Sequence, residues 1–161
     1  RVSWLLKDRI HQRLEAARTT SSPGEFLRRL NGKWQRGEDL FRDAVICAKN
    51  TAYLFDGPPV PIKVAYVKRD TSDVAEELQD GGQLVVLLNL FGQDVGVSLR
   101  TDRDDIDVSK IAQRCFGGGG HRMAASGFAR RSHLVGGFQA VRDVVAAMVS
   151  EQLEAATTDA V

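Results

Sequence analysis

Four consecutive glycines, Gly117 to Gly120, restrict the folding of this 161-residue chain more than any other feature of its sequence. Glycine loses more backbone freedom on folding than any other residue, at a cost of roughly 0.5–1 kcal/mol each relative to alanine. The run lies between a helical pattern and an apolar segment, whereas a linker is usually flanked by polar sequence. We therefore expect a tight loop at a binding surface, where the backbone needs positive φ values or something approaches too closely for a Cβ atom. A flexible linker is the alternative.

Two cationic side chains, His121 and Arg122, follow the glycines directly. Bare backbone N–H groups beside one tunable and one permanent cation suit an anion with several oxygens, most simply a phosphate. The segment from Ile106 to His133 also holds five basic residues and one acidic residue, which gives a net charge of +4. A solvated basic face, and a structural role for His121, are the alternatives. The basic residues are Lys110, Arg114, Arg122, Arg130 and Arg131, and the acidic residue is Asp107.

The composition is that of an ordinary soluble domain, with 43% apolar residues, 27% charged residues and a net charge of +1. Cys47 and Cys115 are too few for a disulfide framework and lie in apolar segments, which favours a reducing, cytoplasmic location. No run approaches the roughly 18 apolar residues of a membrane helix, so we expect no membrane partner. The chain opens on Arg1 rather than methionine, and we expect it to be a fragment of a longer protein.

The periodicity of apolar residues predicts strand hairpins interspersed with helices. Residues 1–40 are more polar than the rest and read as a helical lead-in or connector, whereas residues 41–157 form the main domain. Together these elements predict the α/β (α+β) class, with a central mixed β-sheet of about five strands flanked by helices. The expected helices cover 1–18, a short stretch ending at Asn31–Gly32, 70–82, 107–117 and 138–153. The expected strands are the apolar segment within 44–55 and its hairpin partner 60–67, joined by a turn at 57–59, followed by 84–91, 95–99 and 124–130.

The sequence offers no evident machinery for cleaving a bound phosphate. Its three histidines show no metal-binding spacing, and neither cysteine stands in a recognisable nucleophile motif. No Gly-Lys-Ser/Thr follows the glycines, so the run is not a Walker loop. A group of four aspartates is more typical of a solvated turn with a helix cap than of a magnesium site. These are Asp102, Asp104, Asp105 and Asp107.

Three segments, Val97–Arg100, Ile106–Ala112 and Gly117–Phe128, resemble the DHH-associated C-terminal domain of the DHH phosphoesterase superfamily. The combined spacing of Ser-x-Arg, Asp-Val-Ser and Gly-Gly-Gly-Gly-His is far more specific than any one element. The superfamily includes oligoribonucleases, phosphoadenosine-phosphate phosphatases, cyclic-dinucleotide phosphodiesterases, single-strand DNA exonucleases and exopolyphosphatase-related proteins. The chain departs from the usual pattern at Met123, often Asn, and near Ser126, often Gly, which bears on ligand identity.

The resemblance implies a division of labour between two domains. An N-terminal DHH domain would carry the aspartates and histidines that bind two metal ions, usually manganese. This chain contains no Asp-His-His, so no metal cofactor is expected in it, and that domain is an expected partner. Its other expected partner is a single-stranded oligonucleotide or nucleotide phosphate. The residues implied to bind it are Ser98, Arg100, Gly117, Gly118, Gly119, Gly120 and His121.

Two functions follow, with different consequences for chemistry. The first is the substrate-binding domain of a metal-dependent phosphoesterase that acts on short RNA or on small nucleotides such as phosphoadenosine phosphate or cyclic dinucleotides. The alternative is a stand-alone nucleic-acid-binding module without hydrolysis, as similar domains are when attached to alanyl-tRNA synthetases. A purely structural domain would bind no anion at the glycine loop.

Overall fold

The chain divides into two compact units, Arg1–Leu40 and Phe41–Val161, which are described separately. The helix expected over residues 1–18 lies outside the described residues. Among the described residues, no helix combines the length and apolar character needed to cross a membrane. The computed structural model describes residues 23–57, 59–68, 71–91, 94–130 and 137–158.

The described part of the first unit is helical, and it corrects the sequence prediction. Helix α2 runs over Pro23–Thr51, so the predicted end at Asn31–Gly32 was wrong. A glycine inside a helix costs only about 1 kcal/mol relative to alanine, and the flanking residues are good helix formers. An ion pair one turn apart, between Arg29 and Glu25 at 2.6 Å, adds a little support on the helix surface.

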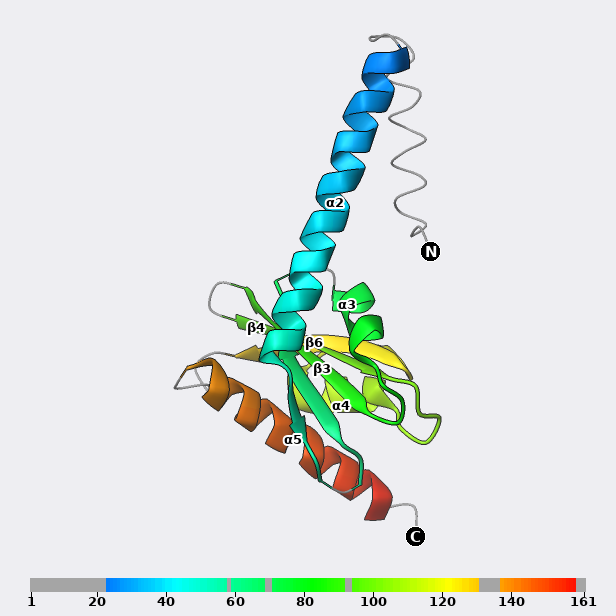
Figure 1. Ribbon diagram of the computed structural model, residues 1–161. Helices are drawn as coiled ribbons and strands as arrows, with labels where there is room; N and C mark the ends of the chain where they lie inside the picture. Colours follow the sequence, from blue (N-terminus) through cyan, green and yellow to red (C-terminus); the bar gives the residue numbers. More distant parts are fainter. Residues whose placement is uncertain (1–22, 58, 69–70, 92–93, 131–136, 159–161) are drawn as a thin grey trace. The chain divides into compact units, whose positions relative to one another are not determined.

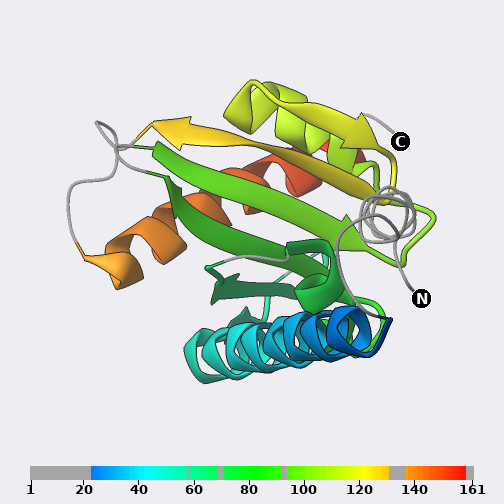
Figure 2. The same ribbon diagram turned by 90° about the horizontal axis from the view of Figure 1, so that it is seen from above.

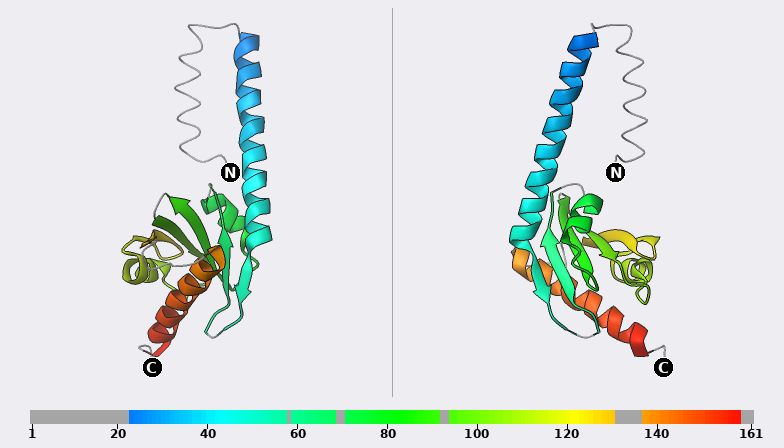
Figure 3. Two further views of the ribbon diagram at one scale, coloured as in Figure 1. Left: turned by 90° about the vertical axis from the view of Figure 1, so that its left-hand side faces the viewer. Right: turned by 45° about the vertical axis from the view of Figure 1, so that its right-hand side comes forward.

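The second unit is built on a mixed sheet of six strands in the order β1-β2-β3-β4-β6-β5 (Figure 1). All neighbouring pairs are antiparallel except β2 and β3, which are parallel. The mixed sheet flanked by helices confirms the predicted class, and the sheet has one strand more than the five expected. The β1–β2 and β5–β6 hairpins form its opposite edges (Figure 3). The strands are β1 Tyr53–Phe55, β2 Ile62–Tyr66, β3 Leu84–Phe91, β4 Asp94–Thr101, β5 Gly119–His121 and β6 Ala124–Arg130.

Helices cover both faces of this sheet, as Figure 2 shows. Helix α3 (Thr71–Leu78) connects the parallel strands β2 and β3, and it packs on one face with the last turns of α2. Helices α4 (Val108–Phe116) and α5 (Phe138–Thr158) pack on the opposite face. Strand β3 sends alternate side chains into both cores, which confirms the central strand predicted from its apolar run.

Among the described residues, no helix covers part of one sheet face. On the α3 side, the side chains of β2 and β3 are buried, including Val85 and Leu87. On the same side of β5 and β6, Gly119, His121 and Ser126 are exposed, and Phe128 is 59% exposed. We call this surface of β4, β6 and β5 the open face.

Candidate phosphate-binding site

The glycine run begins as the end of a helix. Asp107 caps the N-terminus of α4 by accepting a hydrogen bond from the Ser109 backbone N–H at 3.1 Å, as the sequence predicted. At the other end, Gly117 adopts a left-handed conformation with a φ of 57°. The N–H groups of Gly117 and Gly118 both donate to the carbonyl of Ala112, the second at 3.0 Å. Those two amides are therefore engaged within the protein.

The next glycines are required by close packing against the chain itself. A Cβ atom on Gly118 would overlap the carbonyl oxygen of Ser126, and one on Gly120 would lie 2.5 Å from the carbonyl oxygen of Ala124. Gly120 also has a φ of 150°, which side-chain-bearing residues rarely adopt. Both reasons anticipated for a glycine run, positive φ and close approach, are therefore present. The approaching group at Gly118 and Gly120 is the neighbouring strand β6.

The second half of the run forms the edge strand β5 rather than a loop. Gly119, Gly120 and His121 pair with β6 in an antiparallel register. Glycine-rich sequence seldom predicts a strand, which is why this sixth strand was missed. Gly119 alone combines an ordinary φ with open space at its Cβ position. Of the four glycines, it is the one that the chain's own conformation and packing do not require.

The strand register places four of the seven predicted binding residues on one face. Arg100 in β4 lies opposite Ala124 in β6, which lies opposite His121 in β5. Directly opposed residues project to the same side of a sheet. Because neighbouring strands lie about 4.8 Å apart, Arg100 and His121 stand roughly 10 Å apart across the open face.

A second row runs parallel to the first across the same three strands. Ser98 in β4 lies opposite Ser126 in β6, which lies opposite Gly119 in β5. Ser98 is 9% exposed, whereas Ser126 and Gly119 are exposed. The two rows together bring one guanidinium, one imidazole, two hydroxyls and a glycine backbone to a single surface, a set suited to binding phosphate and sugar oxygens.

Arg100 is held at the border between the open face and α3. Its Nη2 donates to the hydroxyl of Ser72 in α3 at 2.9 Å, and its Nη1 donates to the carbonyl of Leu99 at 2.8 Å. Partial burial lowers the pKa of Arg100, and the Glu76 carboxylate opposes that shift. A guanidinium remains protonated throughout the accessible pH range. Its charge therefore acts from a partly desolvated position, where attraction to an anion is stronger than in water.

The β5–β6 turn is tied to the rest of the unit through its carbonyl groups. The backbone N–H of Thr101 donates to Met123 at 3.1 Å, and that of Val108 donates to Arg122 at 2.9 Å. These bonds connect the turn to the end of β4 and to the start of α4. The hairpin that carries His121 is thereby fixed to two other elements.

Three residues on or beside the open face were not singled out from the sequence. Ser126 and Phe128 project from β6, and Ser72 orients Arg100 from α3. The alternation of buried Ala125, Gly127 and Ala129 with outward residues could have identified the first two. The Ser72 contact joins residues 28 positions apart, so no local pattern reveals it.

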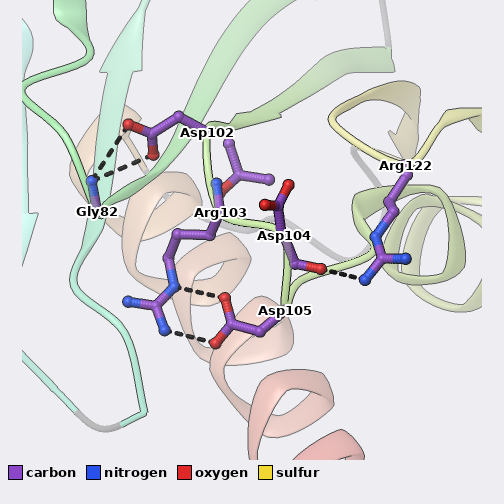
Figure 4. Close-up of polar contacts among 7 residues, drawn as sticks. Gly82, Asp102, Arg103, Asp104, Asp105 and Arg122 are labelled. Carbon is purple, nitrogen blue, oxygen red and sulfur yellow. Dashed lines mark hydrogen bonds and ion pairs between the residues drawn. The ribbon is translucent and has the colours of Figure 1, made fainter.

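Two of the four aspartate carboxylates, those of Asp102 and Asp105, bind neighbouring protein groups (Figure 4), and that of Asp107 caps α4. Asp102 accepts from the Gly82 backbone N–H at 3.1 Å, and Asp105 forms an ion pair with Arg103. The carbonyl oxygen of Asp104 accepts from Arg122, and Asp107 is the cap of α4. Within the described residues, no group of three or more histidine, cysteine, aspartate or glutamate side chains fits a metal ion. The resemblance placed the manganese ions on a separate N-terminal domain, and the described aspartates take part here in a turn and a helix cap.

Comparison with solved structures identifies the fold. The chain resembles an exopolyphosphatase-related protein from Bacteroides fragilis, with 14% identity and a TM-score of 0.55 over 74% of this chain and 36% of that one. It also resembles the pGpG-specific phosphodiesterase PggH from Vibrio cholerae, with 13% identity and a TM-score of 0.52 over 91% of this chain and 50% of that one. The C-Ala domain of alanyl-tRNA synthetase from Aquifex aeolicus matches at 13% identity and a TM-score of 0.47, over 61% of this chain and 98% of that one.

These likenesses concern the fold, which the chain shares with part of the first two proteins. The chain spans about a third of the Bacteroides protein and half of the Vibrio protein. No protein-family model matches the sequence, and no curated protein sequence matches it.

Proposed function

We propose that this chain is the substrate-binding domain of a metal-dependent phosphoesterase of the DHH type. Its open face would bind the phosphate and sugar of a short oligoribonucleotide or of a small nucleotide, such as phosphoadenosine phosphate or a cyclic dinucleotide. The observation that carries the proposal is the register that aligns Arg100 with His121 and Ser98 with Gly119 across β4, β6 and β5. The family likeness of these same residues supports it.

Each predicted group has a distinct task in this proposal. Arg100 offers a fixed, partly desolvated guanidinium, which can hold two oxygens of one phosphate in a bidentate manner. Gly119 allows a ligand to approach the backbone of β5 without meeting a side chain. His121 supplies a second polar contact from the far side of the open face. Gly117, Gly118 and Gly120 would act by shaping the hairpin that presents these groups.

The fold likeness supports the kind of chemistry proposed. Two proteins that share this fold are described as exopolyphosphatase-related and as a pGpG-specific phosphodiesterase. Phosphoester hydrolysis by such enzymes needs a metal-activated water, which a manganese-binding partner domain would supply. In this arrangement the present chain binds and orients the substrate, and orientation alone can lower a reaction barrier by several kcal/mol.

Isothermal titration with the dinucleotide pApA tests the proposal. The Arg100→Ala change should weaken binding by about 1.5–3 kcal/mol, because a hydrogen bond to a charged group is lost. The affinity of the Arg100→Lys variant should lie between those of the unsubstituted chain and of Arg100→Ala, because lysine keeps the positive charge but lacks the planar guanidinium that binds two oxygens at once. Arg142→Ala is a matched control, because Arg142 stacks on the Tyr53 ring in the β1 edge strand, at 4.1 Å from its centroid. Unchanged affinity after Arg100→Ala would remove this residue from the site.

A hydrolysis assay separates the two functions foreseen from the sequence. With manganese present, this chain alone should bind pApA without cleaving it, and robust turnover would refute the proposed division of labour. An Asp-His-His segment encoded upstream of Arg1 would support the phosphoesterase. Binding of long single strands by a gene product that lacks such a segment would favour the stand-alone module instead.

A further inference from the structure

The basic residues near the glycine run do not all serve the open face. Lys110 and Arg114 project from α4, and Arg122 projects from the β5–β6 turn. All three line a pocket on the side of the sheet covered by α4 and α5, opposite Arg100 and Ser98. Arg103, from the segment after β4, lines the same pocket. Three of the five basic residues counted around the glycines therefore lie at this pocket and not on the open face.

The pocket has an apolar floor and a volume of about 420 Å³. That volume lies within the range of ordinary small-molecule sites. Its lining comes from the β1–β2 connection, the segment between β4 and α4, α4 itself and the end of α5. The floor consists of the buried side chains Val60, Ile106, Ile111 and Leu153. These side chains offer apolar contacts at the base of the pocket, below a rim of polar and charged groups.

The rim of the pocket is cationic, and several of its groups are held in place. Arg103 forms a two-point ion pair with Asp105, Arg122 donates to the Asp104 carbonyl, and Arg114 lies 3.5 Å from the Gln152 Oε1 atom (Figure 4 shows the first two). The pairing lowers the pKa of Asp105 and raises that of Arg103, so both stay charged near neutral pH. Four cations against Asp105 and Asp107 leave the lining with a net charge of +2.

We propose that this pocket is a second ligand site, for a small phosphate ester whose other half is apolar or aromatic, as in a mononucleotide. The floor would take the ring, and Lys110, Arg114 and Arg122 would bind the phosphate at the rim. The inference does not depend on the open face binding anything. The pocket nevertheless lies next to the β5–β6 hairpin, which carries His121 of the open face. The backbone N–H of Val108, at the start of α4, donates to the Arg122 carbonyl in the turn of that hairpin at 2.9 Å.

Methyl-resolved NMR of the full chain, titrated with AMP, tests the inference without any substitution. AMP should shift the methyl signals of Ile106, Ile111 and Leu153, which form the pocket floor. The methyl signal of Ala124 in β6, which lies opposite Arg100, reports on the open face separately. Adenosine offers the ring without a phosphate, and inorganic pyrophosphate offers phosphate groups without a ring. Each should need at least a tenfold higher concentration than AMP to give the same shift of the floor signals. If AMP shifts only the β6 signal at millimolar concentration, the second site does not exist.

Charge substitutions provide the second readout. Lys110→Gln with Arg114→Gln should weaken the response of the floor methyl groups to AMP by at least tenfold, because two cations leave the rim. The response of β6 should change less than twofold. Lys49→Gln with Lys68→Gln removes the same charge from two exposed positions outside the pocket lining and should leave both responses intact. If both pairs of substitutions weaken the floor response equally, general electrostatic attraction of AMP to the protein explains the response, and the inference is overturned.

The Arg100→Ala variant distinguishes failure of this inference from failure of the proposed function. Loss of the β6 response with a preserved floor response would support two independent sites. A floor response that disappears with Arg100→Ala would show that one site accounts for both signals and would contradict the second site. If AMP shifts the floor signals but not the β6 signal of the unsubstituted chain, the second site is supported, and only the proposed function of the open face is contradicted.

Discussion

At the scale of single residues, the four glycines have different physical roles even though the sequence presents them as one run. Gly117 ends α4 in a left-handed conformation, and Gly118 and Gly120 pass too close to β6 to carry a Cβ atom. Gly119 has neither constraint. The presence of glycine at position 119 is thus the part of the run that a ligand would explain.

Alanine substitutions separate these roles. Gly118→Ala should destabilise the domain by about 1–3 kcal/mol, because its Cβ meets backbone rather than a movable side chain. Gly120→Ala should cost a similar amount, since strain at its φ of 150° adds to the overlap. Gly119→Ala should change the free energy of unfolding by no more than about 0.5 kcal/mol. Urea denaturation measures all three.

The same variants connect stability to binding. If the ligand approaches β5 closely, Gly119→Ala should weaken pApA binding although the protein stays fully folded. A Gly119→Ala variant with native affinity would show that the ligand does not contact this backbone. The sequence could predict that the run is special, because both physical reasons for consecutive glycines apply. It could not assign the glycines individually, since the clash at Gly118 involves Ser126 in another strand.

At the scale of elements, local signals identified the helices that begin and end with capping residues. Asp107 and Gly117 cap the two ends of α4, and Gly81 and Gly82, both with positive φ, follow α3. The internal glycines of α2 were misleading because a long helix tolerates them. The pairing register, on which the candidate site depends, is a relation between β4, β6 and β5. No single segment carries that information.

The cap of α4 makes a testable contribution to stability. Asp107→Ala should cost about 1 kcal/mol at neutral pH, whereas Asp107→Asn should cost much less because asparagine is also a good cap. Chemical denaturation at several pH values measures both. The hydrogen bond from the Ser109 hydroxyl lowers the pKa of Asp107 in the folded protein.

The sign of the pH dependence follows from that shift. A carboxyl group with a lowered folded-state pKa stabilises the fold above its unfolded pKa of about 3.9 and loses that contribution as the pH falls through the folded value. The difference between wild type and Asp107→Ala should therefore shrink below about pH 4. A difference that stays constant or grows on acidification would contradict this account of the cap.

At the scale of the whole molecule, the second unit consists of one sheet between two helical layers, with the hydrophobic cores meeting at β3. Composition and the alternation of strand and helix patterns were sufficient to predict this class. The number of strands was underestimated because three residues, mostly glycine, act as a strand only through pairing with β6. The parallel β2–β3 pair likewise depends on the path of the chain through α3.

Hydrogen exchange should follow this layering. Amides of β3 and β4, which are paired on both sides, should exchange most slowly, above all those of β3, which lies between the two cores. Amides of the edge strands β1 and β5 should exchange fastest among the strands, by several orders of magnitude under native conditions. Mass spectrometry of peptides from the two hairpins measures the contrast. Protection of β5 equal to that of β3 would contradict the edge position.

The edge strand β5 also has a consequence for association between molecules. A sheet that ends in a long apolar strand offers its unpaired backbone to any passing chain and invites polymerisation. Here the terminal strand is three residues long, and two of them are glycine. Such an edge gives another polypeptide almost no side chains to pack against. An edge of this kind therefore limits strand-to-strand association between molecules while leaving the proposed ligand face beside it uncovered by side chains of its own.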